Sequence, residues 1–148
     1  MTTSSPNAAV QEKAMTTTVV NSDTLFNPAP YGFSHAVVAE NVQKIAYIAG
    51  QGGEDKNGKL DSNFANQVKQ AYKNLKVAIE STNAETKHVT KLTTYVVNYE
   101  PTMLDVMTQE LVAVFGEHLP AQTLVPVPRL TLDGMLFEVD AVVVIENN

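Results

Sequence analysis

The sequence predicts one domain of the α+β class, built from a single sheet with two helices packed on one face. Two segments carry apolar residues at helical spacing, and five shorter segments have the β-branched and aromatic content of strands. The expected order is strand, strand, helix, strand, helix, strand, strand, so the helices alternate with the strands of one sheet. With 148 residues, 44% of them hydrophobic, the chain has enough apolar material for one core.

Residues 1–22 are rich in Thr, Ser, Asn and Ala, and we expect them to form a flexible tail. The single domain is then expected to cover residues 23–148. Its first two strands are predicted at Ala36–Asn41 and Ile45–Gln51, and the short segment between them predicts a hairpin that opens the sheet. The glycines within residues 50–58 favour a turn, because they lack the spacing of a phosphate-binding loop.

The first helix is expected over residues 63–82, with a polar residue near its start as the N-terminal cap. Asp61, Ser62 and Asn63 are the candidates for that cap. The apolar residues of this segment recur at helical spacing and are expected to face the core: Phe64, Val68, Ala71, Leu75, Ala78 and Ile79.

A third strand is predicted at Leu92–Val97, where Thr, Tyr and Val predominate. Pro101 suits the first turn of the second helix, which is expected to run to Phe115. Its apolar stripe is typical of a helix that packs on a core, and it consists of Met103, Leu104, Met107, Leu111, Val114 and Phe115.

The fourth strand is predicted at Thr123–Leu130 and contains two prolines, Pro126 and Pro128. Both lack an amide proton, and at a spacing of two both missing donors fall on the same edge. This pattern predicts a strand at the margin of the sheet. The margin either protects the protein against aggregation or contacts a ligand or a subunit.

The last strand is predicted at Met135–Ile145, and its residues alternate between two faces. One face is wholly apolar and is expected to pack on the helices. Glu138 and Asp140 lie on the other face, between apolar neighbours. We expect this carboxylate face to look towards another layer, a cavity or another subunit.

Composition excludes several classes of site. The chain has no cysteine, so disulfides, thiolate nucleophiles and cysteine-ligated metals are excluded. The three histidines lack the spacing of metal ligands, and neither a metal nor a cofactor is predicted. A net charge of -6 with a single arginine argues against a nucleic-acid partner. No apolar run of about 18 residues predicts a membrane span, and no secretory signal is recognised, so a cytoplasmic protein is expected.

Five segments carry motifs in a consistent order: YIAGQGG at 47–53, the helix over 67–79, KLTTYVVN at 91–98, PAQTLVPV at 120–127 and FEVDAVV at 137–143. Together they resemble the RidA/YjgF family of reactive intermediate deaminases, over residues 32–145. The resemblance implies a chorismate-mutase-like fold with a mixed sheet, and a homotrimer whose sheets form an inner barrel. It also implies a small-molecule ligand in each cleft between subunits.

In deaminating members of that family, an arginine binds the carboxylate of a 2-imino or 2-amino acid. A glutamate near the chain end helps to activate water, and hydrolysis releases ammonia. The resemblance places Glu138 at the catalytic glutamate and Gly50 at the glycine whose backbone approaches the ligand. The arginine position is Gln122, while Arg129 lies seven residues on, at another family position.

Four more ligand-binding positions follow from the resemblance, and each departs from the family pattern: Phe33 replaces tyrosine, Ala49 serine, Thr108 asparagine, and Leu124 cysteine or valine. Phe33, Ala49 and Leu124 make the pocket more apolar, and Gln122 replaces a fixed cation by a neutral amide. An anionic imino acid would lose about 2–5 kcal/mol of binding free energy, or tens to thousands of fold in affinity. A neutral ligand escapes that penalty.

Three functions remain open at this point. The first is a Rid-family protein that binds or hydrolyses a small neutral metabolite, with Glu138 positioning water if an enamine or imine is deaminated. The second is a non-enzymatic trimer with a ligand-binding, chaperone-like or regulatory role. The third is an endoribonuclease, which the acidic charge disfavours.

Overall fold

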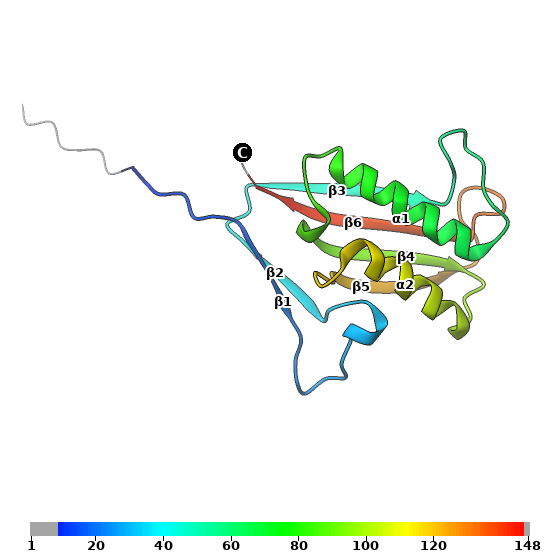
Figure 1. Cartoon of the computed structure of the whole chain (residues 1–148), viewed down its shortest axis with the longest axis horizontal. Helices are drawn as coiled ribbons and strands as arrows, with labels where there is room; N and C mark the ends of the chain where they lie inside the picture. Colours follow the sequence, from blue (N-terminus) through cyan, green and yellow to red (C-terminus); the bar gives the residue numbers. More distant parts are fainter. Residues whose placement is uncertain (1–8, 147–148) are drawn as a thin grey trace, which may run out of the picture.

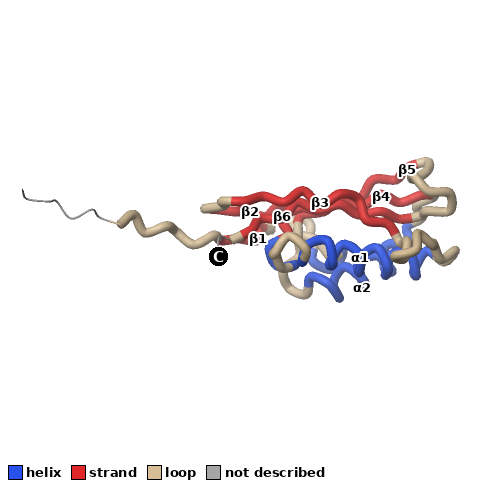
Figure 2. Tube along the Cα trace, turned by 90° about the horizontal axis from the view of Figure 1, so that it is seen from above, coloured by secondary structure: helices blue, strands red, loops and turns tan. Residues whose placement is uncertain are grey.

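The structure is a computed structural model, and it describes residues 9–146. Two helices lie on one face of the strands (Figure 2), which confirms the expected α+β class. The elements follow in the order β1 (Thr16–Val20), β2 (Ala36–Glu40), β3 (Lys44–Gly52), α1 (Phe64–Glu80), β4 (Val89–Val97), α2 (Leu104–Phe115), β5 (Ala121–Val127) and β6 (Phe137–Ile145). Short 3-10 turns occur at Ala29–Tyr31, Thr86–His88 and Pro101–Met103.

The main sheet has four strands in the order β3-β6-β4-β5. Strand β6 is antiparallel to both of its neighbours, whereas β4 and β5 are parallel and are connected through α2. A parallel pair needs such a crossover, because a tight turn can join only antiparallel strands. The sheet is therefore mixed. Strand β5 lies at its margin, as predicted, but it begins and ends earlier than the predicted Thr123–Leu130, so Pro126 lies within the strand and Pro128 just beyond its end.

The predicted hairpin between the first two strands is wrong. Strand β2 pairs with β1, from Thr16 opposite Glu40 to Val20 opposite Ala36, and this two-stranded ribbon stands apart from the main sheet (Figure 1). Strand β3 pairs with β6 instead. The prediction assumed that strands adjacent in sequence pair with each other, and here an earlier segment takes that place.

Strand β1 lies inside the segment that the sequence predicted to be a flexible tail, residues 1–22. Its sequence, TTTVV, has the β-branched side chains that suit a strand, but its residues are mostly exposed and add little to the core. Residues 1–8 of the predicted tail lie outside the described residues.

The core lies between the helices and the main sheet. Asn63 is the cap of α1, since its side chain accepts a hydrogen bond from the Asn66 amide at 3.1 Å. The α1 positions expected to face the core are fully or partly buried, and Tyr72 joins them by packing its ring 5.7 Å from Phe137. None of the helices in the described part of the chain is both long and apolar enough to cross a membrane.

The final strand has the two faces that its alternation predicted. Phe137, Val139 and Val143 are fully buried against the helices. Glu138 and Asp140 lie on the opposite face, which no helix covers in residues 9–146 (Figure 2). The fold therefore presents the two carboxylates on the open face of the sheet.

Two side-chain amides of α1, from the buried Gln67 and the partly buried Asn74, hold the end of the sheet that carries these groups. The Gln67 side chain donates to the carbonyl oxygens of Asp61 and Gly134, and accepts from the Leu136 amide at 2.8 Å. About two turns further along the same face of α1, the Asn74 side chain donates to the carbonyl oxygens of Gly52 and Glu54, at 2.9 and 2.8 Å. These bonds fix the start of β6 and the end of β3 to the helix.

Candidate functional site

An open cavity of about 380 Å³ lies beside the marginal strand β5. Three predicted site residues line it, namely Phe33, Gln122 and Leu124. The other lining residues were not predicted as site residues: Phe26, Tyr31, Tyr99 and Leu104, the last of which was expected only in the apolar stripe of the second helix. The aromatic residues at 26, 31 and 33 surround a proline-rich turn, and that exposed aromatic loop is the signal from which this wall could have been found.

The aromatic wall of the cavity is held together by edge contacts between rings. The Phe26 ring centroid lies 6.0 Å from both the Tyr31 and the Phe33 centroids, and 5.6 Å from that of His35. These separations are in the range that favours edge-to-face packing of aromatic rings. Hydrogen bonds support the loop behind them, since the His35 amide donates to the Asn21 side chain at 2.8 Å.

A serine anchors this loop to β5. The Ser34 amide donates to the Pro120 carbonyl at 3.0 Å, and the Ser34 hydroxyl donates to the Leu119 carbonyl at 2.7 Å. Ser34 also forms a parallel bridge with Ala121, the residue before Gln122. Phe33 is therefore placed next to Gln122 by backbone hydrogen bonds.

Thr108 supports the loop and does not line the cavity. Its hydroxyl donates to the Tyr31 carbonyl at 3.2 Å. Its methyl group would lie 3.2 Å from a Cβ atom on Gly32, whose φ of +79° already favours glycine. These contacts allow Thr108 to position Tyr31, and the ligand-binding role that the resemblance implied for Thr108 stays a prediction.

Gln122 presents the amide group of the cavity. Its side-chain oxygen is buried and has no hydrogen-bond partner among the described residues. Leaving a buried acceptor unpaired costs about 1–3 kcal/mol. The lining residues include no charged side chain that would pair with a ligand carboxylate.

Glu138 and Gly50 lie together on β6 and β3. The pairing of these strands is irregular between Ile48 and Gln51, which places Ala49 and Gly50 in a bulge. A Cβ atom on Gly50 would overlap the Glu138 carboxylate, lying 2.6 Å from its Cδ atom. Glycine is thus required here because the carboxylate occupies the space of a side chain.

Further carboxylates and a tyrosine surround Glu138. Burial raises the pKa of Glu138 above its ordinary value of 4.5, and the charges of Glu54 and Asp140 raise the pKa further. The Tyr95 hydroxyl donates to the Asp140 carboxylate at 3.1 Å. Burial is the largest cause that raises the pKa of Tyr95, and the hydrogen bond with Asp140 is the second. Glu138 therefore holds a proton more readily than an ordinary glutamate does.

The raised pKa of Glu138 predicts a pH-dependent stability. The folded protein binds this proton more tightly than the unfolded chain, so stability falls as pH rises from 4.5 through the raised pKa. Glu138→Gln removes that fall. We expect the difference in Tm, variant minus parent, to become more positive between about pH 4 and pH 8. Glu117→Gln, at an exposed position, controls for the lost charge, and a difference that does not change with pH would contradict the prediction.

The structure separates the predicted site residues into two groups on opposite faces of the sheet. Gln122 pairs with Leu92, which is fully buried beneath the helices, so its side chain lies on the helix-covered face. Glu138 pairs with Tyr95 and lies on the open face. Gln122, Phe33 and Leu124 are brought together at the cavity, and Glu138, Gly50 and Ala49 at the bulge. Within one protomer, these two groups of residues lie on opposite faces of the sheet and do not form one site.

Comparison with known proteins identifies what this fold resembles. Residues 26–145 match the family described as Endoribonuclease L-PSP. A Rid-family protein of unknown function from Yersinia pestis, YyfB, is 31% identical, with a TM-score of 0.83, and the match covers 87% of this chain and 98% of that one. RidA from an Antarctic Psychrobacter species is 27% identical, with a TM-score of 0.64, over 76% and 88% of the two chains.

A more distant structure shows the same fold. The YjgF gene product of E. coli is 24% identical, with a TM-score of 0.61, and the match covers 76% of this chain and 87% of that chain. The comparison with curated proteins gave no match. The matches agree with the resemblance noted from the sequence motifs and support its α+β fold.

Proposed function

Because the chain belongs to the endoribonuclease L-PSP family, which the Rid and YjgF proteins share, we propose that it takes a small uncharged metabolite and binds or hydrolyses it. The observation that carries this proposal is the cavity beside Gln122, whose lining holds aromatic rings, leucines and an amide, and no charged side chain. Burying a ligand carboxylate there would leave an anion without a cation, which is costly. A neutral ligand meets no such cost.

The hydrolytic form of the proposal assigns Glu138 as the group that positions and activates water. A raised pKa brings the carboxyl group closer to the neutral pH range in which general acids and bases work best, and the bulge at Gly50 leaves it room. The substrate would be an enamine or imine, whose hydrolysis releases ammonia. Unchanged turnover of a confirmed substrate by Glu138→Gln would rule this role out.

A homotrimer would bring Gln122 of one protomer and Glu138 of another into the same cleft. Gln122 and Glu138 lie on opposite faces of one sheet, so a cleft that uses both needs Glu138 from a neighbouring protomer. The open face also carries large exposed apolar residues, with Tyr47 77% and Ile45 51% exposed, which supports coverage by another copy of the chain. Sedimentation equilibrium measures the oligomeric state directly.

A binding protein without catalysis is the second candidate. The specific observation that favours it is that Glu138 and the cavity lie on opposite faces of the sheet in one protomer, together with a cavity lining that has an amide and no charged side chain. A ligand that raises Tm and is recovered unaltered would support binding over hydrolysis. Ribonuclease activity fits less well, since Arg129 is the one arginine and pairs with Asp133 at 3.0 Å.

The experiment that tests the proposal compares the natural protein with Gln122→Arg. The readout is release of 2-keto acid from freshly generated 2-aminoacrylate and 2-aminocrotonate, which are anionic. We expect the arginine variant to raise kcat/KM for these substrates tens to thousands of fold, because a buried charge pair is worth about 2–5 kcal/mol. Gln70→Arg makes the same change outside the cavity and is expected to give no gain. Equal activity of natural protein and variant would overturn the preference for neutral ligands.

A further inference from the structure

The walls of the cavity suit a flat, apolar ring. Four aromatic side chains line it, from the loop at 26–33 and from Tyr99 before α2, and two leucines complete the walls. Phe26 and Tyr31 are 62% and 46% exposed although their rings are large. Aromatic rings bury much apolar area and pack by offset or edge contacts, so exposed rings around a hollow favour a planar partner.

The amide of Gln122 sets the polar requirement of the ligand. Its oxygen is buried without a donor among the described residues, and the torsion that turns a glutamine amide is soft. An amide offers two N–H donors and one acceptor oxygen. A ligand that offers both a donor and an acceptor can pair with Gln122 whichever way its amide is turned.

Resting on the proposed neutral-ligand function, we propose that the cavity takes a planar apolar ring bearing a primary carboxamide. A carboxamide matches the glutamine amide donor to acceptor and acceptor to donor. A ketone of the same shape offers acceptors alone and leaves the Gln122 oxygen unpaired. A carboxylate does the same and also brings an anion into a lining that lacks a cation.

Three probes of nearly equal shape test the inference: benzamide, acetophenone and benzoate. Binding to the full-length protein is measured by isothermal titration calorimetry. We expect benzamide to bind roughly 5- to 150-fold more tightly than acetophenone, because an unpaired buried polar group costs that much in affinity. Benzoate is expected to bind most weakly of the three.

Two substitutions in the cavity test whether Gln122 causes the preference for benzamide and whether the aromatic wall binds the ring. Gln122→Met keeps the length of the side chain and removes the amide, so it is expected to abolish the advantage of benzamide over acetophenone. Its Tm is expected to match or exceed that of the natural protein, because an unpaired buried oxygen is removed. Phe33→Leu is expected to weaken both neutral probes alike, since it removes a ring from the wall.

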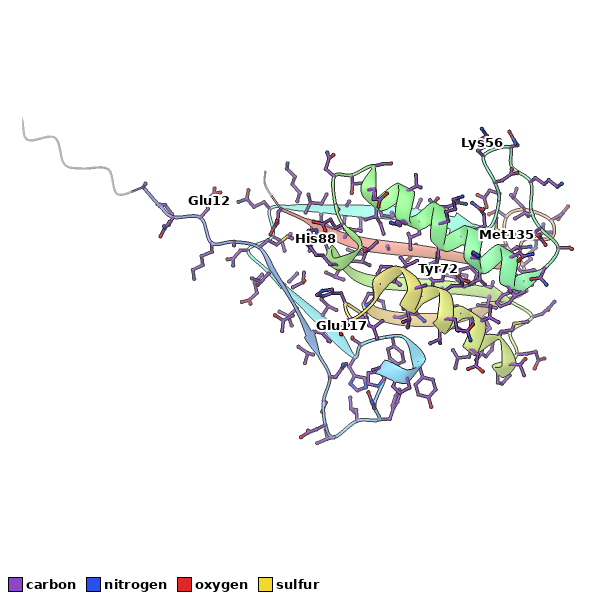
Figure 3. The ribbon with its side chains drawn as sticks, in the orientation of Figure 1. Glu12, Lys56, Tyr72, His88, Glu117 and Met135 are labelled. Atoms are coloured by element: carbon purple, nitrogen blue, oxygen red, sulfur yellow. The ribbon has the colours of Figure 1, made fainter. Side chains whose placement is uncertain are left out.

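Lys56→Met is the matched control. Lys56 lies on the loop after β3, on the far side of the molecule from the aromatic loop (Figure 3). The Lys56→Met variant should bind each of the three probes as tightly as the natural protein does. Equal binding of benzamide and acetophenone, with both weakened by Phe33→Leu, would overturn the carboxamide and leave the neutral-ligand function standing. If benzoate binds most tightly of the three, or if no probe binds up to its solubility limit, both the carboxamide proposal and the neutral-ligand function are overturned.

Discussion

Gln67→Leu is expected to lower the free energy of unfolding by about 3 kcal/mol. Gln67 is fully buried, and its side chain forms three hydrogen bonds, with Asp61, Gly134 and Leu136. Leucine has a similar size but leaves the Leu136 amide and two carbonyl groups without these partners. The measurement is urea unfolding followed by circular dichroism at constant protein concentration, since the stability of an oligomer depends on concentration.

Gln70→Leu is the control for this prediction, because it makes the same change one turn along α1. Gln70 is less buried, and its side chain donates to Asn74 at 2.8 Å and to no backbone carbonyl. We expect its cost to stay below about 1 kcal/mol. A loss of similar size in both variants would show that leucine is poorly tolerated on this part of the helix for reasons unrelated to the hydrogen bonds of Gln67.

Gly50→Ala is expected to reduce the turnover of a confirmed substrate by about 100-fold, because a displacement of about 1 Å in an active site has that effect. The added Cβ atom would overlap the Glu138 carboxylate and lie 2.9 Å from its Cγ atom, so the whole side chain must turn away. The prediction rests on the proposed role of Glu138. Turnover should fall with little change in KM, since the proposed binding site is the cavity by Gln122.

Gly52→Ala tests whether the displaced carboxylate is the cause. A Cβ atom there would overlap the ends of the Glu54 and Met135 side chains, so these flexible ends must move. Gly52 lies opposite Glu138 in the strand pairing, but no Glu138 atom is among the three nearest to that Cβ. We expect turnover to stay much closer to that of the natural protein. Loss of activity in both variants would point to general damage to β3, and full activity in Gly50→Ala would remove Glu138 from the mechanism.

Most of the fold could be predicted from the sequence, because each element carries a local signal. The apolar spacing of α1 and the capping residue Asn63 depend on neighbours three or four residues apart. The alternation of β6 and the prolines in and just after β5, Pro126 and Pro128, are equally local signals. Pairing between distant segments has no such signal, so the ribbon of β1 and β2 was missed.

Less of the candidate site could be predicted. The family motifs pointed to Phe33, Gln122 and Leu124, and the structure gathers these residues around one cavity. The motifs did not reveal Phe26, Tyr31, Tyr99 or Leu104, since a cavity wall is assembled from segments that only folding brings together. Thr108 was predicted to bind the ligand, which stays a prediction, and in the structure its hydroxyl donates to the Tyr31 carbonyl.

The sequence by itself determined which groups the candidate site can use: an amide at position 122, a glutamate on the last strand, and no cysteine. Only the tertiary structure decided how these groups are arranged. The register of β4 with β5 and β6 places Gln122 and Glu138 on opposite faces of one sheet. Register depends on contacts between strands far apart in the chain, and a shift of one residue would exchange the faces.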